Sequence, residues 1–306
     1  MKLRNLVDSI RSHDATLRTH KLERLLRLLD KRQDQILYAF GLWLALGTQL
    51  VLSVERWRAD NQPEFEAALD AWAEFEALNA LAGYAHEHSE DAFPELLQGN
   101  ALYEAVNLRH PLLPRDASVG NDLALNDSVA FYGISGSNMA GKSTFLRAIG
   151  LNAVLSAAGA PVAASSARMT VFSLCASISI HDSLLEGKSK FLAEVERMRD
   201  TIHRLGSDRP ILFLIDEILS GTNSLDRRVA AEAVIRTLVT GGAIGALSTH
   251  DLALAEIADI PGLRGANVHM QGDDVDQPLS FDYRVKPGIS SQTNALAIVK
   301  MMGIDA

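Results

Sequence analysis

Residues 136–143 read Gly-Ser-Asn-Met-Ala-Gly-Lys-Ser and match the pattern GxxxxGK[ST]. The apolar run Val-Ala-Phe-Tyr-Gly-Ile at 129–134 precedes them, and residues 144–149 continue as Thr-Phe-Leu-Arg-Ala-Ile, a helical pattern. A strand that leads into a glycine-rich loop and then into a helix is the context in which this pattern binds nucleotide phosphates. The stretch therefore predicts a strand–loop–helix unit that binds a nucleotide.

Several positions of the loop have an expected task. Gly136 and Gly141 let backbone N–H groups turn toward an anion, and the helix N-terminus adds partial positive charge. Lys142 can reach the terminal phosphates, and Ser143 can offer its hydroxyl to Mg²⁺. The residues expected to contact the nucleotide are Gly136, Ser137, Asn138, Met139, Ala140, Gly141, Lys142, Ser143 and Thr144.

Two acids end the apolar run Ile-Leu-Phe-Leu-Ile at 211–215. Such a run is typical of a central parallel strand, and ligands bind outside the carboxyl ends of those strands. We expect Asp216 to hold Mg²⁺, directly or through water, and Glu217 to orient or polarise a hydrolytic water. An acid pair can also simply end a strand and cap the next helix, but the glycine-rich loop favours the site.

His250 follows a later strand-like run, Ala-Leu-Ser-Thr at 246–249. A lone histidine at a strand end is more often structural. Its position at the same predicted sheet edge instead favours contact with the γ-phosphate of the nucleotide.

The chain after about residue 95 alternates between strand and helix patterns, which argues for an α/β sheet covered on both faces. Strand-like runs occur at 101–108, 122–125, 129–135, 169–180, 211–216, 243–248, 266–270 and 279–285. Helical patterns occur at 142–158, 190–205, 226–240, 251–258 and 291–302. Residues 1–90 read as helices instead, with Pro63 expected to break two of them. We therefore predict a helical domain at 1–95 and an α/β domain at 96–306.

Composition narrows the class of protein further. The net charge of −9 does not mark the whole molecule as a nucleic-acid binder, although residues 1–35 carry nine Lys/Arg against five Asp/Glu. A basic face could meet a phosphate backbone, but a solvated helical face is the commoner explanation. The single cysteine, Cys175, excludes an internal disulfide and is compatible with a reducing compartment. Together with a charged start unlike a signal peptide, this predicts a cytoplasmic protein.

Residues 36–54 are nineteen consecutive residues without a formal charge, and a helix of that length would span a bilayer. Several glycine and polar residues dilute the hydrophobicity of the segment, and a core helix packed on all sides would read the same way. We favour the buried helix, and this segment leaves membrane association open.

From about residue 104 onward the sequence resembles the ATPase domain of the MutS DNA mismatch-repair family, a branch of the ABC-type ATPases. The resemblance rests on the loop, with its distinctive Asn138-Met139 pair, and on residues 186–194 (Glu-Gly-Lys-Ser-Lys-Phe-Leu-Ala-Glu), which look like the family's version of the ABC signature. Further matches are Asp216-Glu217, Gly221-Thr222, Thr249-His250, Ala266-Asn267-Val268-His269, Lys286-Pro287-Gly288 and Arg109-His110-Pro111. Ser137 and Ala140 depart from the usual proline and glycine.

The resemblance implies a P-loop ABC-type ATPase domain with a mixed, mainly parallel sheet flanked by helices and preceded by an all-α domain. It implies ATP and Mg²⁺ as ligands and a composite site shared by a homodimer. One subunit would supply Lys142, Ser143, Asp216, Glu217 and His250, and its partner would present Ser189 to the γ-phosphate in trans. The match of residues 1–95 to the family's core and lever helices is weak, and the mismatch-reading domain has no counterpart.

These features predict either a fragment or a divergent member that acts as an ATP-driven switch in DNA mismatch repair or recombination. Contact with DNA would go through the helical domain or through parts without a match here. The alternative is a membrane-associated or scaffold ABC-type ATPase that does not act on mismatched DNA. A transporter subunit is disfavoured because no LSGGQ string occurs. A small-molecule kinase is disfavoured because Glu217 and the Ser189 segment point to hydrolysis.

Overall fold

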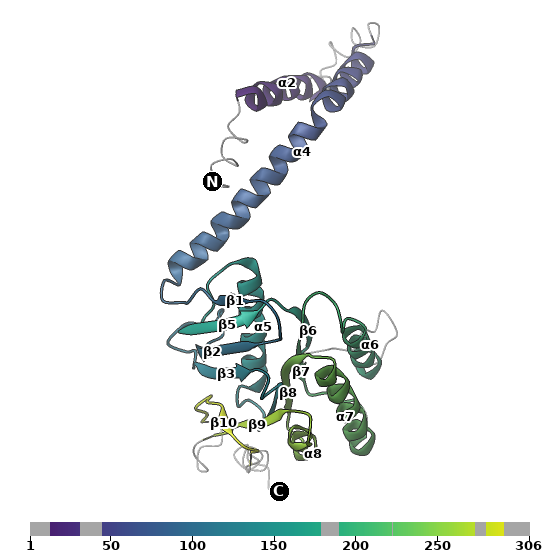
Figure 1. Cartoon of the computed structure of the whole chain (residues 1–306). Coiled ribbons are helices and arrows are strands. Elements are labelled where there is room, and N and C mark those ends of the chain that lie inside the picture. The colour runs from purple at the N-terminus through teal and green to yellow at the C-terminus, as the bar shows by residue number, and fades with distance from the viewer. Residues whose placement is uncertain (1–12, 31–44, 179–189, 222, 273–279, 291–306) are drawn as a thin grey trace, which may run out of the picture. The chain divides into compact units, whose positions relative to one another are not determined.

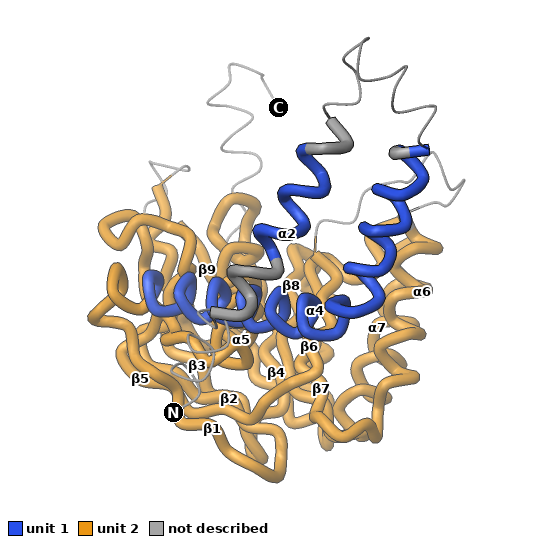
Figure 2. Tube along the Cα trace, turned by 90° about the horizontal axis from the view of Figure 1, so that it is seen from above, with its two compact units in different colours: residues 1–84 blue, residues 85–306 orange. Residues whose placement is uncertain are grey.

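The computed structural model describes residues 13–30, 45–178, 190–221, 223–272 and 280–290. The chain divides into two compact units, residues 1–84 and residues 85–306, which are coloured separately in Figure 2. The predicted domain boundary after residue 95 stays a prediction, and each unit is described by itself below.

Two helices are described in unit 1, α2 (His13–Asp30) and α4 (Leu46–Glu87), whose last residues fall in unit 2. The helix break expected at Pro63 is wrong, because α4 runs through this residue. A proline inside a helix removes one hydrogen bond and costs about 3 kcal/mol. The rings of Trp57 and Phe65 meet edge to face across that turn, with centroids 5.9 Å apart.

The uncharged segment 36–54 is described only from residue 45 onward. There it forms the start of α4, where Val51 and Leu52 are each about half exposed, at 50% and 51%. The expected packing on all sides therefore does not hold for these two residues. In the part of the chain that the structure describes, every helix is too short or too polar to span a bilayer.

The centre of unit 2 is a six-stranded sheet in the order β10-β9-β4-β8-β7-β6. All neighbouring strands are parallel except β10 and β9. The expected mainly parallel α/β architecture is thereby confirmed. The strands are β4 (Phe131–Gly136), β6 (Ser173–Ser177), β7 (Ile211–Asp216), β8 (Ile244–Thr249), β9 (Gly265–Met270) and β10 (Lys286–Pro287).

A second, four-stranded sheet has the order β1-β5-β2-β3 and mixes parallel and antiparallel pairs. Helix α5 (Lys142–Ala158) lies between this sheet and the large one (Figure 1). Its backbone at Ile149 accepts a hydrogen bond from the buried hydroxyl of Tyr103 on β2, at 3.3 Å. The strands are β1 (Glu95–Leu97), β2 (Tyr103–Leu108), β3 (Asn121–Leu125) and β5 (Ser166–Thr170).

The remaining helices cover the other face of the large sheet (Figure 1). They are α6 (Lys190–Ile202), α7 (Ser224–Thr240), α8 (Leu252–Ala255) and the 3₁₀ helix η2 (Glu256–Asp259). The layers are therefore small sheet, α5, large sheet and outer helices. This order buries a continuous apolar core, in which the rings of Phe131 and Phe213 lie 6.3 Å apart on strands β4 and β7.

Two strand predictions differ from the structure. The single run expected at 169–180 is two strands in different sheets, because the chain crosses between the sheets at Val171 and Phe172. The run expected at 279–285 is not a strand over 282–285, where Tyr283 takes a left-handed conformation with φ 54°. The helix expected at 291–302 lies outside the described residues.

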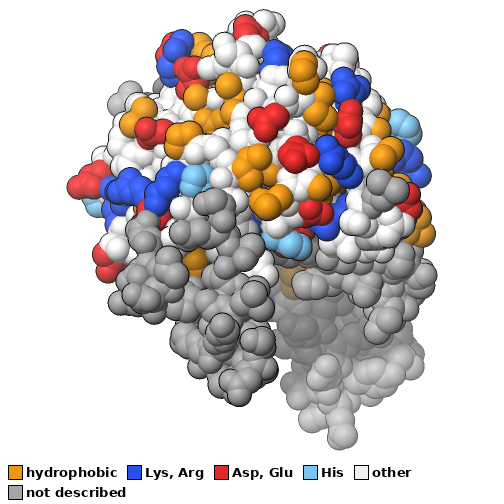
Figure 3. Space-filling model, turned by 90° about the horizontal axis from the view of Figure 1, so that it is seen from below, with side chains coloured by type: hydrophobic (Ala, Val, Ile, Leu, Met, Phe, Trp, Pro, Cys, Tyr) orange, Lys and Arg blue, Asp and Glu red, His pale blue; other side chains and the backbone are white. Residues whose placement is uncertain are grey.

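On the face shown in Figure 3, acidic and basic side chains of the described residues lie interspersed, with hydrophobic side chains between them. The described part of this face therefore carries no large patch of one sign.

Candidate functional site

The loop between β4 and α5 depends on two glycines. Gly136 has φ 143°, and a Cβ there would lie 2.0 Å from the backbone oxygen of Met270 on the neighbouring strand β9. Gly141, the N-cap of α5, has φ 101°. A Cβ on it would lie 3.1 Å from Cδ1 of Tyr283. Only glycine reaches such backbone conformations without strain, so the tight turn requires it at both positions.

Lys142 is the first residue of α5 and is only 6% exposed. Its Nζ donates hydrogen bonds to the backbone oxygens of Gly136 and Ser137, each at 2.8 Å. Burial lowers the pKa of the ammonium group, while the carboxylates of Glu217 and Asp216 act in the opposite direction. The lysine therefore lies folded against the loop, beside two acids.

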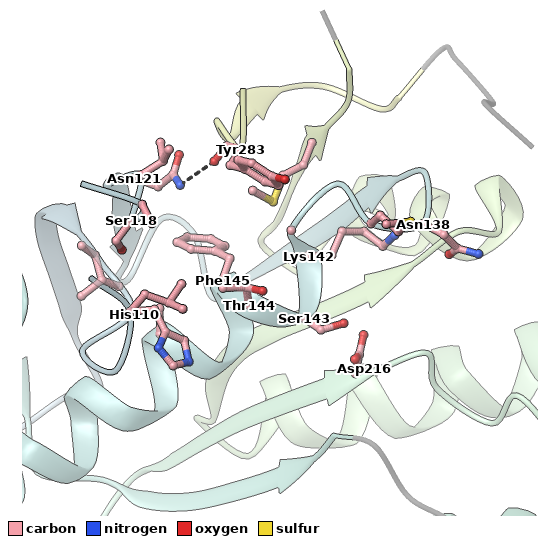
Figure 4. A pocket seen from close by; sticks show the side chains of 18 of the residues that line it. His110, Ser118, Asn121, Asn138, Lys142, Ser143, Thr144, Phe145, Asp216 and Tyr283 are labelled. Atoms are coloured by element: carbon pink, nitrogen blue, oxygen red, sulfur yellow. Dashed lines mark hydrogen bonds between the residues drawn. The ribbon is translucent and has the colours of Figure 1, made fainter. Parts of the chain in front are cut away.

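The carboxyl ends of three strands meet beside this loop. Ser135 on β4 is in register with Thr249 on β8, and Ser248 on β8 is in register with Asp216 on β7. Asp216 Oδ1 accepts a hydrogen bond from the Ser248 hydroxyl, which fixes the carboxylate. Figure 4 shows the side chains of Ser143 and Asp216 pointing toward each other. Two side-chain oxygens of the kind that hard cations prefer thus face one another.

Glu217 follows β7 in a left-handed conformation, with φ 55°. Its backbone N–H donates to the oxygen of Ser248 at 3.1 Å, and its Oε1 lies 2.9 Å from Nδ1 of His250. Left-handed geometry at a residue with a long side chain costs about 1–3 kcal/mol and is concentrated at functional sites. The structure brings Glu217 and His250, which the sequence predicted for the site separately, into direct contact.

The buried Arg227, on the first turn of α7, holds the residue after Glu217. Its Nε donates to the backbone oxygen of Ile218 at 2.8 Å, and Leu219 beyond it is again left-handed, with φ 51°. Sequence reasoning missed this arginine. Its neighbours Asp226 and Arg228 make the stretch read as a solvated helical face.

A cavity of about 460 Å³ lies along the loop. Asp216 lines one end of the cavity, which extends beyond Phe145 to the small sheet (Figure 4), and Glu217 also lines it. Burial, together with the charge of Arg147, lowers the pKa of His110 in this outer part. Sequence reasoning did not assign the outer lining residues to the site. Among them are His110, Leu113, Ser118, Asn121, Phe145 and Tyr283.

Most of the predicted contact residues line this cavity, namely Asn138, Met139, Gly141, Lys142, Ser143, Thr144, Asp216 and Glu217. Gly136, Ser137 and Ala140 shape the loop without lining the cavity, and Ala140 is buried beneath it at 1% exposure. His250 reaches the site through Glu217. Ser189 lies outside the described residues. No group of three or more His, Cys, Asp or Glu suited to a metal ion occurs among the side chains described.

Comparison with known proteins identifies the family. The sequence model of MutS domain V matches residues 133–306, more than half of the chain. The chain belongs to the MutS family. Similarity to whole MutS proteins extends further toward the N-terminus, since a relative from Thermus thermophilus is 31% identical over 291 residues, 94% of this chain and 33% of its own length.

Two other relatives have the same description, DNA mismatch repair protein MutS. The one from Lactobacillus delbrueckii subsp. bulgaricus is 30% identical over 236 residues, 74% of this chain and 27% of the relative. The one from an Exiguobacterium species is 33% identical over 200 residues, 63% of this chain and 23% of the relative. The chain therefore spans a third or less of the length of these MutS relatives.

Proposed function

We propose that this chain is the ATP-binding and ATP-hydrolysing part of a MutS-type conformational switch that acts in DNA mismatch repair or recombination. The observation that supports it most is the cavity that Lys142, Asp216 and Glu217 share at the carboxyl edge of the parallel sheet. A cation, a candidate metal ligand and a candidate base beside a helix N-terminus are the parts that phosphate-ester hydrolysis needs.

The triphosphate would lie along the β4–α5 loop. Backbone N–H groups at the start of α5 have no partner within the helix, so they favour an anion. The ammonium of Lys142, now bound to the oxygens of Gly136 and Ser137, would exchange these carbonyls for phosphate oxygens. A phosphate–ammonium contact is charge-assisted and stronger than a bond to a neutral carbonyl, so the exchange favours binding.

Magnesium would be held by Ser143 and Asp216, whose oxygens face each other (Figure 4). This donor set fits the ion, because Mg²⁺ prefers oxygen ligands and usually keeps several waters beside one or two protein groups. When bound, the ion would neutralise charge on the β- and γ-phosphates. The hydroxyl of Ser248 would hold Asp216 in the orientation that this role requires.

Glu217 is the proposed general base. Its carboxylate would take a proton from a water as the oxygen of that water attacks the γ-phosphorus, and ADP would leave. His250 touches Oε1 and would hold the carboxylate toward the cavity. The backbone of Glu217 would be held by its N–H bond to the oxygen of Ser248. Arg227 would add to this by bonding the backbone oxygen of the next residue, Ile218.

The outer part of the cavity would take the base and ribose. Cavities of about 300–1,000 Å³ bury most of a small ligand, and this one, at about 460 Å³, lies in that range. Phe145 and Tyr283 offer aromatic surface, and His110 offers a ring whose pKa is lowered by burial and by the charge of Arg147. Such walls suit a flat purine.

The proposals of a dimer and of DNA as the target rest on membership of the MutS family. The MutS relatives have names that give DNA mismatch repair as their process. We propose by extension a homodimer in which Ser189 of one subunit meets the γ-phosphate bound to the other, so that ATP joins the two and hydrolysis releases them. The helical residues 1–95 or parts outside this chain would contact DNA, and the protein would work in the cytoplasm.

The direct test of nucleotide binding uses Lys142→Ala. Wild-type protein should bind ATP in calorimetry with Mg²⁺ present, and the variant should lose at least about tenfold in affinity because one charge-assisted contact is gone. Arg236→Ala, an exposed cation on α7 paired with Glu232, is the matched control and should bind ATP like wild type. Unchanged ATP affinity in Lys142→Ala would refute the assignment of this loop.

A further inference from the structure

Asn121 joins two distant parts of unit 2. It is the first residue of β3 and is buried, with 8% of its surface exposed. Its Nδ2 donates to the backbone oxygen of Tyr283 at 3.0 Å, and its Oδ1 accepts from the backbone N–H of Val285 at 2.8 Å. Figure 4 shows the first of these bonds. One side-chain amide thus holds a segment more than 160 residues away in the sequence.

The bonded segment is under backbone strain. Tyr283 has φ 54°, a left-handed conformation that is rare for a bulky residue. Such a conformation persists where surrounding contacts fix it. The two bonds of Asn121 flank this residue, one on its own carbonyl and one on the N–H two positions later. The amide offers a donor and an acceptor on one group, whereas an ionised aspartate offers acceptors alone and could not replace it fully.

The strained backbone aims an aromatic ring at the candidate site. Tyr283 lines the cavity, and its Cδ1 would lie 3.1 Å from a Cβ built on Gly141, so the ring packs directly against the loop. The ring of Phe281 backs it, with centroids 6.0 Å apart. Tyr283 is still 44% exposed, so ring surface remains free for a ligand.

We propose that Asn121 is a positioning residue for nucleotide recognition, which fixes the strained backbone of Tyr283 so that its ring forms a wall for the base end of a bound nucleotide. This inference rests on the proposed function of the cavity. Because Asn121 acts through Tyr283, it raises the affinity for the base end of the nucleotide. It does not change the affinity for the phosphates, which bind at Lys142.

The test compares two ligands, ATP and inorganic tripolyphosphate, each with Mg²⁺, in calorimetry with the full chain. Loss of an aromatic wall should weaken ATP binding by about tenfold. Asn121→Ala should show that loss for ATP and bind tripolyphosphate like wild type. Asn121→Asp keeps the acceptor for Val285 and loses the donor to Tyr283, so it should also lose affinity for ATP alone.

Two further variants separate this role from a general effect on folding. Asn126→Ala removes an amide just after β3 that bonds the N–H groups of Ser128 and Val129, away from the cavity. It should lower thermal stability and leave both affinities unchanged. In the Tyr283→Ala background, adding Asn121→Ala should change ATP affinity no further.

The outcomes that would overturn the inference are distinct. Wild-type affinity for ATP in Asn121→Ala would refute it, and so would an equal loss for ATP and tripolyphosphate. An additive loss in the double variant would show that Asn121 acts independently of Tyr283. Wild-type protein that binds neither ligand would contradict the proposed function itself, and this inference with it.

Discussion

Nδ1 of His250 lies 2.9 Å from Oε1 of Glu217, although the two residues follow different strands of the sheet. Glu217 follows β7 and His250 follows β8, and the parallel register brings these strand ends together. Among the described residues, His250 is the side chain that contacts the carboxylate of Glu217, the proposed base. It predicts a measurable effect of the histidine on turnover.

His250→Ala should lower kcat for ATP by about tenfold or more, with little change in ATP affinity, because Glu217 loses the partner that orients it. Steady-state hydrolysis and calorimetry measure the two quantities. His203→Ala, an exposed histidine beyond α6, serves as the control and should leave both unchanged. A change in affinity without a change in kcat would argue that His250 contacts the nucleotide instead.

Gly136→Ala should destabilise the fold by about 3 kcal/mol, because a Cβ 2.0 Å from the Met270 oxygen adds a clash to the strain of the backbone. Gly262→Ala is matched to it. Gly262 also has positive φ, 86°, but nothing lies within 4 Å of its Cβ position, so it should lose only about 1 kcal/mol. Urea unfolding followed by circular dichroism compares them. Equal losses would mean that β9 does not constrain the loop.

The lowered pKa of His110 predicts a pH dependence of stability. Burial and the charge of Arg147 disfavour its protonation in the folded state. Below an unfolded value of about 6.5 the unfolded chain therefore binds a proton that the folded chain does not, and stability falls with falling pH until the folded pKa is passed. His110→Asn should lose less stability than wild type between pH 7.5 and 5.5 in urea titrations. An identical loss in both would refute this cause.

Mixing two inactive variants tests the composite site. Lys142→Ala disables the site in cis, and Ser189→Ala should disable the site that the partner completes. In an equal mixture that pairs at random, about half of the dimers would be mixed, and each mixed dimer would have one intact site of its two. About a quarter of all sites would then be intact, so about a quarter of wild-type ATPase activity should return. If mixing restores no activity although the two variants form mixed dimers with ATP, Ser189 does not act in trans.

The parts of the site that the sequence predicted are those encoded by local pattern. The strand before residue 136, the helix from Lys142 and the acids after Ile215 each lie within one short motif, and the parallel sheet brings their ends to one edge. Hydrophobic periodicity and strand-end chemistry therefore carried most of this prediction.

The parts that the sequence did not predict depend on contacts between distant residues. Asn121 meets Tyr283 across more than 160 positions, and no pattern near either residue marks the pair. Arg227 is buried by the loop it supports although its neighbours are exposed. Pro63 carries a strong local signal that was misleading, because the helix continues through it and the Trp57–Phe65 contact spans the same turn.

The most direct test of the central proposal is ATP turnover by Glu217→Gln. Glutamine keeps the size of the side chain and cannot accept the proton of the attacking water, so kcat should fall by about 10²–10³ while Mg²⁺–ATP still binds with wild-type affinity. Single-turnover hydrolysis and equilibrium binding on the same preparations give both numbers. A Glu217→Gln variant that hydrolyses ATP at the wild-type rate would contradict the account.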